Sequence, residues 1–175
     1  TNKGHAVLSE VTIENAKTGI KVEGNLSANK VTIKDSYIGI NVIGSADITS
    51  LTAQHIDYEV LRNSGFLNLS SGTFTDIAGG LWSTGISTVD TLAISQAGTG
   101  LRSTSGTLSA TGIGFIDTTV AIASQQGAST TVDSITANNV ALLIDASDSD
   151  DLTISSAAVS GQRLLLANGA STFSI

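Results

Sequence analysis

The sequence contains no cysteine, proline or methionine, and its aromatic residues are one Trp, two Tyr and four Phe among 175 residues. Without cysteine, a disulfide framework and thiol chemistry are both excluded. No apolar run approaches the roughly 20 residues that a membrane-spanning helix needs, so membrane insertion is not expected. The chain begins at Thr1 without a signal-peptide pattern, and we expect residues 1–175 to be one domain of a longer protein.

Basic residues are also scarce, because eight Lys and Arg stand against fifteen Asp and Glu, for a formal net charge of −7. Five of the cations precede residue 35, and the rest of the chain is strongly acidic. Neutralising the phosphates of a nucleic acid requires a basic face. A nucleic-acid partner is therefore not expected.

Small and apolar residues are abundant instead: the chain has 18 Gly, 24 Ser and 22 Thr, and 41% of its residues are hydrophobic. It is too apolar for a disordered Ser/Thr-rich stalk, which could not offset the entropy lost on ordering the chain. A chain of this length can bury a sizeable core as one domain. The composition indicates a fold that depends on regular backbone pairing more than on bulky side chains.

A short repeat runs along the sequence. Residues 11–13, Val-Thr-Ile, recur as residues 31–33, and the glycine-bounded segment 19–24 recurs as residues 39–44. From these copies, a pair of apolar positions seven residues apart can be followed to the end of the chain. The pairs, of which we call the first member the anchor, are Ile13/Ile20, Ile33/Ile40, Ala53/Val60, Phe74/Leu81, Ile94/Leu101, Phe115/Ile122, Ala137/Ile144 and Val159/Leu166. Successive anchors are 20 to 22 positions apart, which places the insertions in one turn region.

The apolar positions alternate within short runs, which is the period of a strand with one buried face. A repeat of this length is too short for a strand plus a helical crossover but suits three short strands joined by turns. The sequence therefore predicts an all-β fold, a right-handed single-stranded parallel β-helix of about eight coils. With strands about 4.8 Å apart, the column is expected to be about 40 Å long, with every anchor facing inward.

Residues 13–22, Ile-Glu-Asn-Ala-x-x-Gly-Ile-x-Val, and their copy at 33–42 resemble the repeats of the pectate-lyase-like parallel β-helix family. That family includes pectin and pectate lyases, polygalacturonases, phage tailspikes and many microbial surface proteins. The resemblance covers nearly the whole chain and implies a backbone and an extracellular or cell-surface location, but no particular reaction. The enzymes of the family use grouped carboxylates in a groove walled by long loops, which the nearly uniform coils of this chain do not provide.

A polar residue stands two positions after each anchor, so the sequence predicts a ladder of polar side chains along one corner of the coils. We define this turn ladder as Asn15, Asp35, His55, Asp76, Gln96, Asp117, Asn139 and Gly161. One interpretation is acid–base chemistry, with the His55 imidazole oriented by flanking carboxylates. The interpretation that we favour is that Asn, Asp and Gly tolerate a left-handed backbone at a turn. If the chain is an enzyme, the expected catalytic residues, gathered around the irregular third coil, are Asp35, His55, Asp57, Glu59 and Asp76.

Outward-facing residues eight positions after the anchors predict a binding surface. In this register Leu61, Trp82 and Arg102 lie side by side, and the guanidinium of Arg102 is placed for a cation–π contact with the indole ring. Such an apolar platform suits a sugar ring or a partner protein. Arg62 falls in a slot that is apolar in earlier coils, so it is paired, displaced by a bulge, or evidence that the register slips there.

Two further patterns are candidates for ion or ice binding. Asp145, Asp148, Asp150 and Asp151 form the densest acidic run, which could hold a hard cation through carboxylate oxygens. Their spacing matches no calcium-loop signature, so a solvated turn is the favoured interpretation. Outward threonines precede the first four anchors, as in ice-binding β-helices, but the row breaks at the fifth coil. No cofactor is expected.

These observations favour a non-enzymatic structural or adhesive module of an extracellular or cell-surface protein. The ends lack a polar capping repeat, and cations near the start oppose acids in the later coils. We therefore expect flanking domains or copies of the same chain to stack on the coil ends. Glycans are further candidate partners. The rival functions are a carbohydrate-active enzyme, of the polysaccharide lyase or glycoside hydrolase type, and a glycan-binding or ice-binding module.

Overall fold

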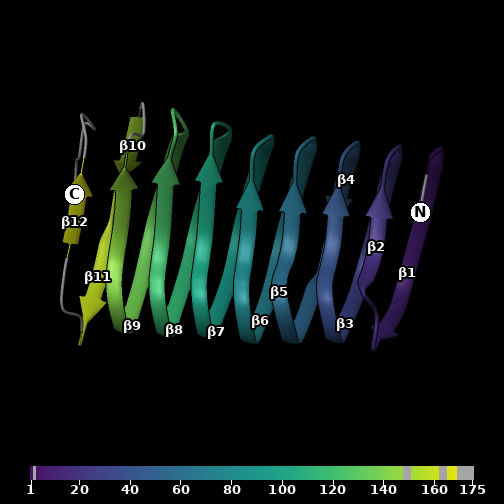
Figure 1. The fold of residues 1–175 in the computed structure, drawn as a ribbon, viewed down its shortest axis with the longest axis horizontal. Helices are drawn as coiled ribbons and strands as arrows, with labels where there is room; N and C mark the ends of the chain where they lie inside the picture. Colours follow the sequence, from purple (N-terminus) through teal and green to yellow (C-terminus); the bar gives the residue numbers. More distant parts are fainter. Residues whose placement is uncertain (2, 148–150, 162–164, 169–175) are drawn as a thin grey trace.

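The computed structural model describes residue 1 and residues 3–147, 151–161 and 165–168. The regular structure in these ranges is all β-strand, and the coils stand in one row with β1 at one end and β12 at the other (Figure 1). The strands are β1 (His5–Glu14), β2 (Thr18–Val22), β3 (Asn25–Val42), β4 (Ser45–Ile48), β5 (Leu51–Asn63), β6 (Phe66–Ser83), β7 (Ile86–Thr104), β8 (Thr107–Gln125), β9 (Ser129–Ser147), β10 (Asp151–Ile154), β11 (Ala157–Ser160) and β12 (Leu165–Asn168). The predicted all-β fold is confirmed.

Parallel pairing between neighbouring coils holds the row together. Each strand pairs with strands one coil away, and together they form one sheet wound into a solenoid of about seven turns. Paired residues are 20 positions apart between β1 and β3 and 22 apart between β8 and β9, which matches the predicted repeat. Left-handed backbone at Lys30 and Asp35 lies within β3, so this long strand bends at two corners of its coil.

The predicted anchors form one column in the core. All eight are in register, from Ile13 opposite Ile33 at one end to Ala137 opposite Val159 at the other. The bulkiest fully buried members are Ile33, Phe74, Ile94 and Phe115. Ile13 is only partly buried because β1 has a paired coil on one side alone among the described residues. The inward orientation that the repeat predicts is thus confirmed.

The second members of the apolar pairs, seven residues after the anchors, form another column, and this column differs from the prediction in two coils. Leu61, and not Val60, pairs with Ile40 on one side and Leu81 on the other. The reason is a bulge in β5, where the register shifts between Ile56 and Glu59 and the strand holds one more residue than its neighbours. In the last coil, the partner of Ile144 is Leu165, not Leu166. The constant offset of seven residues is therefore wrong in the third and the last coil.

The bulge also explains why Arg62 falls in an apolar slot when the sequence is aligned by its repeat. Asn63, not Arg62, occupies the inward position that is Val42 in the coil before and Ser83 in the coil after. Its amide is satisfied there, because Nδ2 donates to the Ile86 carbonyl at 2.8 Å and to Ser87 Oγ at 2.9 Å. A buried amide with its hydrogen bonds made costs far less than a buried guanidinium without a partner.

Another corner of the coils is built from stacked glycines. Its members are Gly24, Gly44, Gly65, Gly85 and Gly106. A Cβ added at Gly65 would lie 2.0 Å from the carbonyl oxygen of Gly44, and each of the others would clash similarly with the coil before it. Glycine is required here because neighbouring backbones approach too closely for any side chain.

Candidate functional site

The turn ladder is a feature of the backbone. All eight of its residues have left-handed backbone, with φ between +48° and +71°. Asn, Asp and Gly tolerate this region better than other residues, which explains most of the ladder. Side chains along it also bond to one another, as Asn139 Nδ2 does to Asp117 Oδ1 at 2.6 Å. The left-handed backbone predicted along the ladder is confirmed.

Within the ladder, His55 lies between two carboxylates as the sequence suggested. Its Nδ1 is 3.3 Å from Asp35 Oδ1, and its Nε2 is 3.2 Å from Asp76 Oδ2. All three side chains are at least half exposed, and none of them lines the Gly79 hollow described below or four further recesses on the described coils. The geometry can orient an imidazole, but these exposed side chains are away from the recesses given for the described coils.

The two other candidate acids of the third coil separate from this group. Asp57 is exposed at the bulge, whereas Glu59 lies farther along β5 and is only 6% exposed. Glu59 pairs in register with Ile38 and Gly79. The five candidate catalytic residues therefore fall into the exposed ladder triad, a solvated Asp57 and a buried Glu59.

Glu59 belongs to a cluster that we call the aromatic–arginine cluster, made of Tyr37, Tyr58, Glu59, Arg62 and Trp82. The rings of Tyr37 and Tyr58 stack with centroids 5.2 Å apart and planes within 5° of parallel. The guanidinium carbon of Arg62 lies 5.2 Å from the Tyr58 ring centroid and 4.6 Å from that of Trp82. Arg62 thus covers two rings at once by cation–π contacts.

Arg62 also neutralises the buried acid. Its Nε donates to Glu59 Oε2 at 2.9 Å, and its Nη2 donates to the Tyr58 hydroxyl at 3.2 Å. Burial raises the pKa of the Glu59 carboxyl, while the charge and hydrogen bond of Arg62 act in the opposite direction. The net direction of the pKa shift is upward because desolvation outweighs Arg62 together with the smaller effect of the Arg102 charge.

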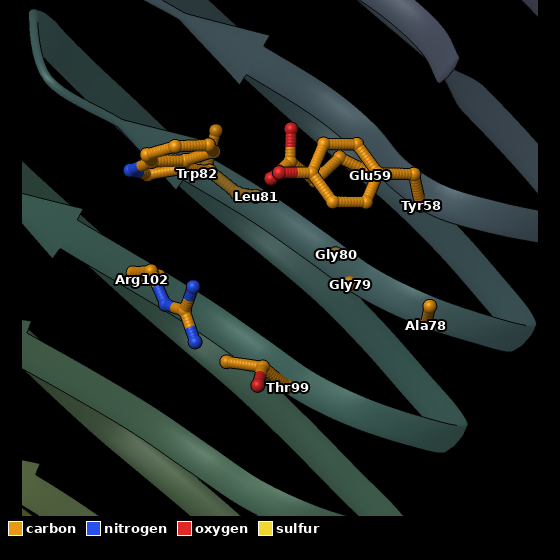
Figure 2. Close-up of a pocket in the computed structure, with 9 residues that line it drawn as sticks. All are labelled: Tyr58, Glu59, Ala78, Gly79, Gly80, Leu81, Trp82, Thr99 and Arg102. Atoms are coloured by element: carbon orange, nitrogen blue, oxygen red, sulfur yellow. The ribbon is translucent and has the colours of Figure 1, made fainter. Parts of the chain in front are cut away.

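Beside the cluster is a recess of about 140 Å³, which we call the Gly79 hollow. Its base is the backbone around Gly79, which takes the place in the column between Glu59 and Thr99 but has no side chain to fill it. Figure 2 shows Tyr58 and Glu59 on one side of this base and Arg102 with Thr99 on the other. Trp82 completes the lining, so three successive coils contribute to the hollow.

Two of the three predicted binding residues are at this hollow. Trp82 and Arg102 pair in register on adjacent coils and both line it. Leu61 was wrongly predicted to face outward: the bulge turns it into the core, where its exposed fraction is 0%, and Arg62 takes its place beside Trp82. The cation–π contact predicted for Arg102 is likewise made by Arg62.

The acidic run does not assemble a metal site in the described chain. Asp145 accepts a hydrogen bond from Gln125 Nε2 at 3.1 Å, and Asp151 is exposed at the start of β10. Asp148 and Asp150 lie outside the described residues. No group of three or more His, Cys, Asp or Glu in the described ranges is arranged to hold a metal ion.

Comparison of the chain with family models, with curated proteins and with solved structures found no match. Over the described ranges, no helix is long and apolar enough to cross a membrane. The features of the chain that bear on its function are therefore the solenoid, the turn ladder and the aromatic–arginine cluster beside the Gly79 hollow.

Proposed function

We propose that this chain is a non-enzymatic structural module of an extracellular or cell-surface protein, a rod that holds its neighbours at a fixed distance. The uniformity of the coils is the observation that carries this proposal. Register partners stay 20 to 22 positions apart from β1 to β11, so no coil has room for a long loop. A continuous parallel ladder makes such a rod stiff, because each coil is held by its neighbours along its length.

The arrangement of acids supports this proposal over a carbohydrate-active enzyme. Glycoside hydrolases of the common type use two carboxyl groups about 5 to 9.5 Å apart across the scissile bond. Glu59 is the one carboxylate that lines the Gly79 hollow, and four further recesses on the described coils are each lined by at most one carboxylate. The repeat resembles that of pectate-lyase-like proteins, and we propose that the chain shares their right-handed winding without their catalytic groove.

The outer edge of the first coil supports stacking as part of this role. In the described chain β1 pairs only with β3, and Val7 is 70% exposed beside the partly buried Ala6 and Leu8. A strand edge with apolar side chains beside it favours pairing with a further coil. We propose that flanking coils or a second copy of the chain cover it.

A length series tests the rod. Inserting three further copies of residues 86–106 after Gly106 should give a folded protein about 14 Å longer, since each coil adds about 4.8 Å. The measurement is the maximum dimension from small-angle X-ray scattering, together with circular dichroism. An insert that unfolds the chain or leaves its length unchanged would contradict independent stacking of coils.

A cleavage screen tests the absence of catalysis. The chain is incubated with neutral and acidic polysaccharides, beside the variants Glu59→Gln and His55→Asn, and new reducing ends or unsaturated products are measured. We expect no product above the buffer control from any of the three proteins. Turnover by the native chain that either variant abolishes would overturn the proposal and identify the catalytic residue.

A further inference from the structure

The Gly79 hollow contains polar groups with hydrogen-bonding capacity that the protein does not use. The guanidinium of Arg102 makes no hydrogen bond or ion pair with another described residue, and its Nε is buried. On the other side of the base, Arg62 binds Glu59 through the Oε2 oxygen alone. The hollow therefore offers a donor and an acceptor that the rod itself does not use.

These two groups constrain the chemistry of a ligand. Arg102 can only donate hydrogen bonds, whereas an ionised Glu59 can only accept them. A ligand that spans both must accept at one atom and donate at a nearby one. Adjacent hydroxyl groups on a sugar ring do this, because each hydroxyl is both a donor and an acceptor.

The remaining lining and the size fit one sugar ring. Trp82 and Tyr58 supply aromatic surface on which the apolar face of a pyranose can pack. The volume of about 140 Å³ is well below the roughly 300–1,000 Å³ of pockets for drug-sized ligands. One residue of a glycan fits such a hollow while the rest of the glycan stays in solvent.

Charge favours a neutral sugar over an acidic one. Glu59 is already inside the lining with its single ion pair to Arg62. A ligand carboxylate would gain Arg102 but would stand in the same small space as the Glu59 carboxylate, and like charges this close repel strongly. Hydroxyl groups satisfy both sides without adding charge.

We propose that the Gly79 hollow binds one neutral pyranose residue of a glycan, with Glu59 accepting from one hydroxyl and Arg102 donating to its neighbour. This goes beyond the rod function, which needs no ligand. The site gives the module a point of attachment on its side, away from the coil ends.

The only tryptophan of the chain lines the hollow, so its fluorescence reports binding directly. The probes are methyl glucoside, methyl galactoside, methyl mannoside and methyl glucuronide, with the matching neutral and uronic disaccharides. We expect at least one neutral probe to bind saturably and the uronic probes to bind more weakly. Replacing Arg102 by Met should weaken that binding at least about tenfold, as for loss of a hydrogen bond to a charged group.

Lys21→Met is the matched control, because Lys21 stands in the same outward column as Arg102 and does not line the Gly79 hollow. Its affinity should equal that of the native chain, and thermal unfolding should show both variants folded. Binding that survives Arg102→Met, a preference for uronic probes, or no binding by any neutral probe would each overturn the proposal. Binding without cleavage leaves the rod function intact, whereas cleavage overturns that function and not this site.

Discussion

The solenoid has two groups of polar residues, the turn ladder and the aromatic–arginine cluster, and they arise for different physical reasons. The turn ladder repeats in every coil, is largely exposed, and sits where the backbone is left-handed. The aromatic–arginine cluster occurs once among the described coils, buries Glu59, and lies where one inserted residue shifts the register. The first group follows from the backbone, and the second does not.

This difference gives a general way to judge polar residues in a solenoid. A polar residue in a repeated position is explained once the position has a backbone demand, even when, like His55, it lies between two carboxylates. A polar residue in a unique and buried position has no such explanation and is a better candidate for function. By this criterion Glu59 is a stronger candidate than the ladder triad.

The largest loss of stability should come from a substitution in the stacked glycine corner, where neighbouring backbones leave no room for a side chain. Replacing Gly65 by Ala puts a Cβ 2.0 Å from the carbonyl oxygen of Gly44, so neighbouring coils must separate. We expect the free energy of unfolding to fall by about 3 kcal/mol, the upper range for overpacking. Urea denaturation measures it. Gly114→Ala is the control, since Ala93 and Thr136 in its column already carry a Cβ; equal losses would contradict the argument.

A smaller change in stability distinguishes the backbone conformation of the turn ladder from the contacts between its side chains. His55→Val and His55→Asn both remove the imidazole between the two carboxylates. Only Val is strained at the φ of +52°, because a β-branched side chain fits the left-handed region poorly. Val should therefore be less stable than Asn by about 1–2 kcal/mol in chemical denaturation. If the two variants are equally stable, the left-handed backbone does not determine which residue is tolerated at this position, and the comparison fails.

The repeating features could be predicted from the sequence because each follows a local rule. Alternating apolar residues predicted the anchor column, from Ile13 to Val159. Asn, Asp and Gly in one position predicted the left-handed corner. Neither inference needs contacts between distant residues, since in a solenoid the residue one repeat away is also the spatial neighbour.

The aromatic–arginine cluster could not be predicted because spacing alone does not place an insertion within its coil. The interval from Ala53 to Phe74 is one position longer than the interval before it, and we assigned the added residue to a turn. The useful signal was Arg62 in a core slot, since an unpaired buried charge is too costly to accept. Moving the insertion before Leu61 turns that leucine inward and Arg62 outward, as observed.

The smallest expected effect tests whether burial or the ion pair dominates at Glu59. Its pKa is raised in the folded chain, mainly by desolvation. The contribution of Glu59 to stability is then fully present below its unfolded pKa and is lost as pH rises through its folded pKa. Glu59→Gln has no charge to bury and can still accept the hydrogen bond from Arg62. Its stability relative to the native chain should therefore increase from pH 4 to pH 8.

We expect this increase to remain within about 1 kcal/mol, the scale of a typical hydrogen bond, as measured by urea denaturation at several pH values. Arg62 lowers the pKa of Glu59, so removing it sharpens the test. The stability of the double variant Arg62→Met/Glu59→Gln is then compared with that of Arg62→Met alone. This difference should increase from pH 4 to pH 8 by more than the difference between Glu59→Gln and the native chain does. A difference that shrinks as pH rises would mean that the ion pair outweighs burial, and Glu59 would then resemble the charges of the turn ladder.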